Sequence, residues 1–129
     1  MKSMIIFILV SVSGLAHASQ ETESVVLAIQ GKWHEQGQAC GTILQFEHPD
    51  IVYIKTGESE AQGTFTVDDG PVISPGFRYR FDIQIRENNG ISACNNSVLY
   101  EVGDFPPMSF RLEERDTLII EGAVFRRGE

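Results

Sequence analysis

Between residues 77 and 86, apolar and polar side chains alternate at every position of the chain. The odd-numbered positions are all apolar: Phe77, Tyr79, Phe81, Ile83 and Ile85. The even-numbered positions are all polar: Arg78, Arg80, Asp82, Gln84 and Arg86. A period of two is typical of a β-strand with one buried and one solvated face. The pattern therefore predicts a strand over Phe77–Glu87 whose odd residues face a core.

Similar but shorter segments recur along the chain and are separated by turn residues such as His48-Pro49-Asp50 and Asp68-Asp69-Gly70-Pro71. They predict strands over Lys32–Glu35, Thr42–Glu47, Ile51–Lys55, Gln62–Val67, Ile91–Val102, Met108–Glu113, Thr117–Glu121 and Ala123–Arg127. One short helical turn is predicted over Ser24–Ile29, because Ser24 is a suitable cap and Gly31 a suitable stop. The pattern indicates a single antiparallel all-β domain, either a sandwich or a barrel.

Asn89-Gly90 is the preferred pair for a two-residue hairpin turn, because both positions need a positive φ angle. Such a turn would join Phe77–Glu87 to Ile91–Val102 and fix their register. The predicted partners are Tyr79 with Tyr100, Phe81 with Val98, Ile83 with Asn96 and Ile85 with Cys94. Asn96 would then be a polar group on the apolar face.

The N-terminal segment has the layout of a secretory signal peptide. Lys2 precedes an apolar run over Met4–Val12, and Ala16-His17-Ala18 is a suitable cleavage site. We therefore expect residues 1–18 to be removed and residues 19–129 to form the single exported domain. The expected location is the bacterial periplasm or the extracellular space.

The chain is acidic, with a formal net charge of −8, and the leader would remove one basic residue and no acidic one. This charge disfavours nucleic acid and anionic membranes as partners and favours a cationic one. A membrane-inserted barrel is also disfavoured, because most of the predicted strands are shorter than the nine or more residues needed to cross a bilayer. The two cysteines, Cys40 and Cys94, are predicted to form a disulfide after export.

Gly31-Lys32-Trp33 begins the first predicted strand, and the last one ends in Arg126-Arg127. This arrangement resembles that of calycins, which include lipocalins, avidin and small periplasmic protease inhibitors. The resemblance implies an up-and-down β-barrel of about eight strands, in which Arg126 or Arg127 lies over Trp33 and closes one end. It also implies a binding function without catalysis.

No catalytic, metal-binding or phosphate-binding motif occurs in the chain. His34 and His48 are expected on opposite faces of the sheet, so a shared metal ion is not expected. We therefore expect no enzymatic activity, no metal and no cofactor.

Three functions remain open. The first is a carrier of a small hydrophobic or amphipathic molecule inside the barrel. Its predicted lining comprises Leu44, Phe46, Phe65, Tyr79, Phe81, Ile83, Asn96, Val98 and Tyr100. The second is an inhibitor of a cationic secreted hydrolase, such as a lysozyme or a metalloprotease, through the loops Gly57–Glu60, Asp68–Gly76 and Gly103–Met108. The third is a structural protein of the cell envelope that has no ligand.

Overall fold

The computed structural model describes residues 22–69, 76–92, 94 and 100–128. A helix over residues 22–28 is followed by nine strands. The strands are β1 (Gly31–Glu35), β2 (Thr42–Glu47), β3 (Ile51–Thr56), β4 (Ser59–Asp68), β5 (Tyr79–Asn88), β6 (Gly103–Asp104), β7 (Met108–Glu113), β8 (Thr117–Ile120) and β9 (Ala123–Gly128). The predicted signal peptide lies outside the described residues.

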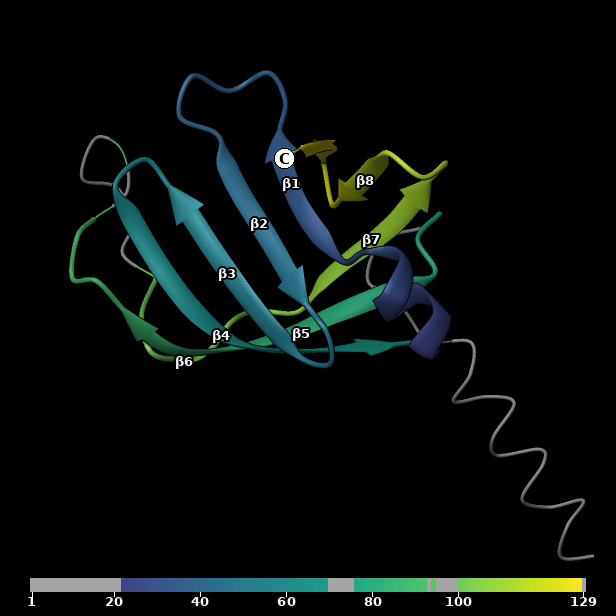
Figure 1. Cartoon of the computed structure of the whole chain (residues 1–129), viewed down its shortest axis with the longest axis horizontal. Coiled ribbons are helices and arrows are strands. Elements are labelled where there is room, and N and C mark those ends of the chain that lie inside the picture. Colours follow the sequence, from purple (N-terminus) through teal and green to yellow (C-terminus); the bar gives the residue numbers. More distant parts are fainter. Residues whose placement is uncertain (1–21, 70–75, 93, 95–99, 129) are drawn as a thin grey trace, which may run out of the picture.

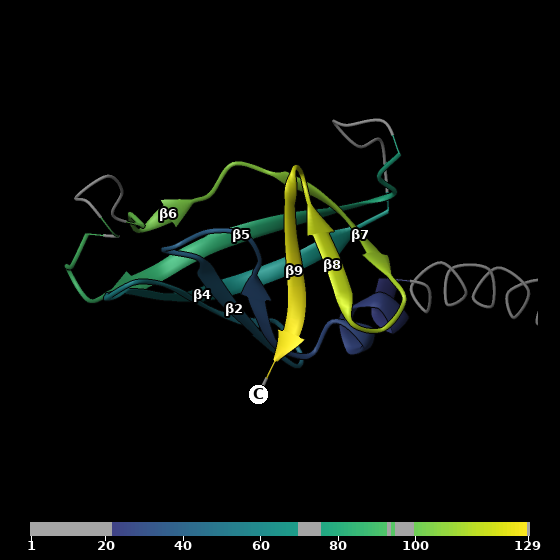
Figure 2. The same cartoon turned by 90° about the horizontal axis from the view of Figure 1, so that it is seen from above.

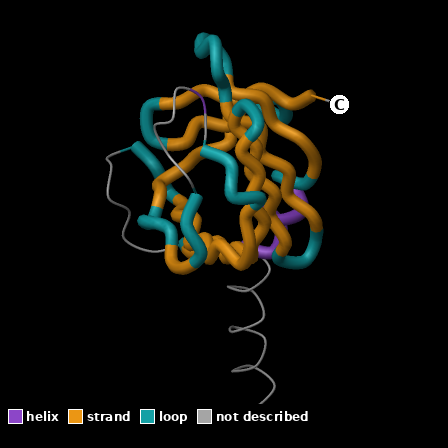
Figure 3. Tube along the Cα trace, turned by 90° about the vertical axis from the view of Figure 1, so that its left-hand side faces the viewer, coloured by secondary structure: helices purple, strands orange, loops and turns teal. Residues whose placement is uncertain are grey.

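Eight of these strands form a closed antiparallel barrel, and the short β6 pairs with β5 beside it. Each barrel strand pairs with the next along the chain, and the β1–β9 pairing closes the ring. Figure 1 shows β1 to β5 as one wall, and Figure 2 shows β7, β8 and β9 side by side in the opposite wall. Viewed from the left of Figure 1, the strands form a ring (Figure 3). The predicted up-and-down barrel is confirmed.

The predicted strands, apart from Ile91–Val102, coincide with the eight barrel strands, and their ends differ by at most three residues. The inside and outside of β5 are also as expected, because Phe81, Ile83 and Ile85 are buried. The odd positions face the core because only that register removes their apolar surface from water.

The predicted hairpin through Asn89-Gly90 is wrong. Tyr79 pairs with Phe110 of β7, Phe81 with Met108, and Ile85 with Gly103 of β6. None of the described residues between 91 and 102 is in a strand. Val98 and Asn96, two of the expected partners, lie outside the described residues.

The side chains of Asn88 and Asn89 explain why the predicted hairpin does not form. Only Gly90 of the expected turn has a positive φ angle, so the turn is not of the two-residue type. Asn89 instead binds the β3–β4 turn: its Nδ2 donates to the Glu58 carbonyl at 2.8 Å, and its Oδ1 accepts from the Glu60 N–H at 3.2 Å. Asn88 Nδ2 donates to the Tyr100 carbonyl at 2.9 Å. These bonds direct the chain away from the edge of β5.

Four phenylalanines fill part of the interior. The rings of Phe81 and Phe110 stack with centroids 3.8 Å apart, and Phe46 lies 5.2 Å from Phe81 and 5.0 Å from Phe65. All four are at most 2% exposed. Close-packed aromatic rings leave no room for a ligand, so this part of the barrel is core.

Candidate functional site

One end of the barrel is closed by the helix, Trp33 and Arg127. The fully buried Trp33 donates its Nε1–H to the carbonyl of Ile29, the residue after the helix, at 2.9 Å. Arg127 faces Trp33 across the β1–β9 ladder, with its guanidinium carbon 4.2 Å from the centroid of the Trp33 ring. Arg126 is displaced by one position and faces His34. Of the two arginines that the resemblance left open, Arg127 is therefore the one over the indole.

The Arg127 guanidinium also ties three parts of the chain together. It donates to the carbonyls of Gln30 (2.6 Å) and Ala28 (2.8 Å) at the end of the helix and of Arg115 (3.0 and 3.1 Å) in the β7–β8 turn. Carbonyls at the end of a helix lack partners within it, and a cation is favourable there. The helix is thus held across this end of the barrel (Figure 1).

A cavity of about 200 Å³ lies at the opposite end, among residues from seven barrel strands and the segment before β7. Most of the lining is apolar, and Glu35, Thr42 and Glu121 contribute polar groups. The complete lining is Glu35, Thr42, Leu44, Ile54, Ile83, Tyr100, Phe105, Met108, Ile120, Glu121, Ala123 and Phe125. An apolar cavity with a few converging polar groups is typical of small-molecule sites.

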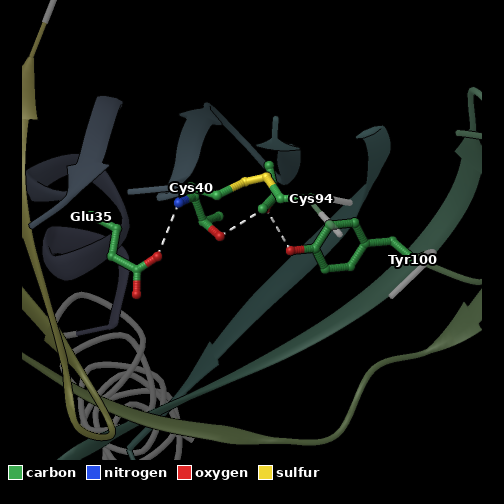
Figure 4. Close-up of a disulfide and its surroundings, with 6 residues drawn as sticks. Glu35, Cys40, Cys94 and Tyr100 are labelled. Atoms are coloured by element: carbon green, nitrogen blue, oxygen red, sulfur yellow. Dashed lines mark hydrogen bonds between the residues drawn. A yellow bond between two sulfur atoms is a disulfide. The ribbon is translucent and has the colours of Figure 1, made fainter. Parts of the chain in front are cut away.

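The polar groups at one side of the cavity form a connected row. The Thr42 N–H donates to Glu35 Oε1 at 2.9 Å. The Thr42 and Thr56 hydroxyls are 2.8 Å apart, and the Thr56 hydroxyl lies 2.7 Å from that of Tyr100. Figure 4 shows Glu35 and Tyr100 approaching this row from opposite sides. Three hydroxyls that share two hydrogen bonds retain one O–H for a further acceptor.

The Cys40–Cys94 disulfide lies beside this row (Figure 4), and the predicted pairing is confirmed. Its Cα atoms are 6.2 Å apart and are separated by 54 positions in the sequence. It joins the β1–β2 loop to the segment after β5. A Cβ atom on Gly57 would lie 2.6 Å from Cys94 Sγ, and Gly57 has a φ angle of +62°, so this turn position requires glycine. The disulfide and the β3–β4 turn therefore fix one rim of the cavity.

The structure brings only part of the predicted lining to this cavity. Leu44, Ile83 and Tyr100 line it. Phe46, Phe65 and Phe81 belong to the packed aromatic core, and the half-buried Tyr79 stacks on Phe110 with centroids 5.7 Å apart. Asn96 and Val98 lie outside the described residues.

Sequence reasoning missed several lining residues, above all Glu35 and Phe105. Glu35 was detectable, because it follows Trp33 by two positions and so shares its inward face in a strand. Phe105 was not, because it lies in an irregular segment without a periodic pattern. The Phe105 N–H donates to the Ile83 carbonyl at 2.8 Å, which holds this segment against β5.

Two larger hollows, of about 380 and 550 Å³, lie among residues of β3, β4 and β5 and around β6. Polar residues form a larger share of their lining than of the smaller cavity's, including Gln62, Glu87 and Asn88 in the first and Thr66, Asp82 and Gln84 in the second. Small-molecule sites are lined predominantly by apolar side chains with only a few polar groups. The smaller cavity at the barrel end is therefore the better candidate site.

One titrating cluster lies on the outer face of β4 and β5, away from the cavity. Arg80 donates to Asp68 at 3.2 Å and to Asp82 at 3.3 Å. The hydrogen bond that the two carboxyls share, together with burial, raises the pKa of Asp82. The same bond lowers the pKa of Asp68, and Arg80 adds to this effect. The two carboxyls thus share one neutralising partner.

No protein family, curated protein or solved structure matches this chain at a significant level. Within the described ranges, no helix has both the length and the apolar character required to traverse a bilayer. The same part of the chain holds no group of three His, Cys, Asp or Glu side chains suited to a metal ion. The cavity at the barrel end is therefore the feature of this chain that bears on its function.

Proposed function

We propose that this protein is an exported, non-catalytic binding protein that holds one small amphipathic molecule in the cavity at the open end of the barrel. The observation that carries the proposal is the cavity itself, whose apolar lining ends in the Glu35–Thr42–Thr56–Tyr100 row. Apolar walls favour a hydrophobic body, and the polar row favours a group that forms hydrogen bonds.

The volume limits the size of the ligand. A cavity of about 150 Å³ is known to hold a benzene molecule, so about 200 Å³ suits a single ring with a short polar substituent. A long acyl chain does not fit, because the aromatic core blocks further penetration. Among the described residues, the helix and Arg127 cover the other end of the barrel, so we expect the ligand to enter at the end beside the disulfide.

The proposed kinship with calycins is supported by the geometry of the closed end. The Gly31-Lys32-Trp33 segment opens β1, and Arg127 of the last strand covers Trp33 while closing one end of the barrel. Export is supported by the disulfide, because disulfides persist mainly in oxidising compartments.

A cavity-filling variant tests the proposal. Ala123 lines the cavity, whereas its neighbour Val124 is on the outer face and 38% exposed. Native mass spectrometry of the protein purified from its own host should show a small-molecule adduct, and Ala123→Leu should lose it while Val124→Leu keeps it. An adduct that persists unchanged in Ala123→Leu would place the ligand elsewhere and overturn the proposal.

A second candidate is the inhibition of a cationic secreted hydrolase through the β3–β4 turn. Glu58 and Glu60 are exposed there, and Asn89 braces the turn through three hydrogen bonds. A rigid acidic loop suits a cationic partner, because little conformational entropy is lost on docking. A titration with lysozyme tests it: binding that is abolished by Glu58→Lys would favour inhibition, and no binding would exclude this target.

A further inference from the structure

The carboxylate of Glu35 has no cationic partner within the described part of the chain. One of its oxygens accepts the Thr42 N–H, and no Lys, Arg or His side chain in the described ranges forms an ion pair with it. Glu35 is half-buried and lines an apolar cavity. A carboxylate in such a setting binds a positive charge more strongly than one in bulk water.

The lining of the cavity contains a second acidic side chain and, among the described residues, no Lys, Arg or His. Glu121 is the other carboxyl at the cavity, and its Oε2 accepts the Ser109 N–H at 2.6 Å. A carboxylate or phosphate ligand would therefore meet the Glu35 carboxylate in a lining without a cation. This repulsion disfavours fatty acids and other anions.

Two aromatic side chains complete the arrangement. Tyr100 and Phe105 both line the cavity, with ring centroids 6.1 Å apart. The faces of aromatic rings attract cations, and the attraction increases when water is excluded. A carboxylate, free hydroxyl lone pairs and two rings around one apolar cavity are the combination that suits an ammonium group.

From this arrangement we infer that the ligand is a small aromatic or aliphatic primary amine, bound as its ammonium form with the charged end at Glu35. The inference deepens the proposed function and rests on it. The ammonium donates to Glu35 and to the hydroxyl row, and its apolar body lies against Leu44, Ile83 and Phe125.

Three probes of similar size and different charge test the inference. They are 2-phenylethylamine (cationic at pH 7), 2-phenylethanol (neutral) and phenylacetate (anionic), each titrated into the full mature protein by calorimetry. We expect the amine to bind about tenfold more tightly than the alcohol, because only the ammonium adds a Coulomb attraction between opposite charges to its hydrogen bond with the Glu35 carboxylate. We expect phenylacetate not to bind.

Glu35→Gln shows whether the preference comes from this carboxylate. The glutamine oxygen still accepts the Thr42 N–H, so the local structure is preserved. The variant should bind the amine no better than the alcohol, because the Coulomb attraction between the carboxylate and the ammonium is removed. Glu60→Gln is the matched control: it removes one negative charge from an exposed position outside the cavity and should keep the preference.

The outcomes separate the two proposals. If the alcohol or phenylacetate binds as tightly as the amine, or if Glu35→Gln keeps the preference, the ammonium inference is overturned and the binding function stands. If none of the probes binds at millimolar concentration, and the native protein carries no adduct, the binding function and the inference are overturned together.

Discussion

Arg127 and Trp33 face each other across the β1–β9 ladder, and the guanidinium carbon of Arg127 lies 4.2 Å from the centroid of the indole ring. The same guanidinium donates hydrogen bonds to the carbonyls of Ala28, Gln30 and Arg115. One side chain thus covers the base of the barrel and holds the helix and the β7–β8 turn in place. Arg127 therefore provides the main side-chain hydrogen bonds at the closed end of the barrel.

Replacement of Arg127 by lysine should therefore destabilise the protein although the charge is kept. An ammonium lacks the planar fork that reaches several carbonyls and stacks on the indole. We expect Arg127→Lys to lower the free energy of unfolding by about 2 kcal/mol, as judged from two or more lost hydrogen bonds. Urea denaturation followed by Trp33 fluorescence measures it.

Arg126→Lys is the matched control, because Arg126 faces His34 on the other side of β9. Its stability should stay within about 0.5 kcal/mol of wild type, as is usual for exposed positions. Equal losses in the two variants would show that the contact with Trp33 contributes nothing specific.

The disulfide should contribute strongly to stability. It closes a loop between positions separated by 54 residues, and a loop of this length corresponds to about 4 kcal/mol in the chain-entropy estimate. The Cys40→Ala/Cys94→Ala double variant should therefore unfold at a much lower urea concentration than the oxidised wild type. Dithiothreitol should shift the wild type to the same midpoint and leave the variant unchanged. A reduced wild type as stable as the oxidised one would show that other contacts hold the rim.

The strands and their inward faces were predictable from the sequence, because both depend on local alternation. Alternation alone left a sandwich and a barrel open, and the barrel was predicted from the resemblance carried by Gly31-Lys32-Trp33 and the terminal arginines. Phe81, Ile83 and Ile85 are buried whichever strand lies beside them, since the pleat alone sets the face. The partner of β5 was not predictable in the same way. Asn89-Gly90 favours a hairpin locally, but Asn89 bonds to Glu58 and Glu60, which lie about thirty residues earlier in the chain.

The candidate site shows the same division. Leu44 and Ile83 were identified because they lie inward on regular strands, and Tyr100 was identified from a register that is wrong. The division of the interior into a packed aromatic part and a cavity depends on how side chains from opposite walls meet. Alternation along one strand does not carry that information, so Phe46, Phe65 and Phe81 were assigned to the ligand although their rings pack against one another or against Phe110.

Gly63 marks the irregularity in the β4–β5 pairing, which shifts register between Gln62 and Gly63. A Cβ atom there would overlap the Gln84 carbonyl oxygen, which belongs to the backbone of β5 and cannot move aside alone. Gly63→Ala should therefore lower the free energy of unfolding by about 3 kcal/mol, at the upper end of the usual cost of overpacking. Thermal unfolding followed by circular dichroism measures the loss.

Gly122→Ala provides the comparison, because no atom lies within 4 Å of a Cβ atom built at Gly122. Its melting temperature should stay close to that of wild type. If Gly63→Ala melts at the same temperature as Gly122→Ala, β4 and β5 do not approach each other as described.

The Asp68–Arg80–Asp82 cluster predicts an unusual dependence of stability on pH. The pKa of Asp82 is raised in the folded protein, chiefly by its hydrogen bond with Asp68 and by burial. A raised carboxyl pKa means that the folded state binds a proton more tightly than the unfolded state, so stability is lost as the pH rises through the folded pKa. At neutral pH, Asp82 therefore carries a penalty that a neutral side chain would avoid.

Asp82→Asn should remove this penalty, because the amide donates permanently to Asp68. We expect the variant to be more stable than wild type at pH 7 by about 0.5 kcal/mol, a small value because the side chains of the cluster are 33–49% exposed. The advantage should fade as the pH falls through the raised pKa and vanish below the ordinary value of 3.8. Glu87→Gln controls for net charge, because it also removes one negative charge from β5, at an exposed position. An advantage of Asp82→Asn that is equal at pH 7 and at pH 3 would arise from packing and not from titration.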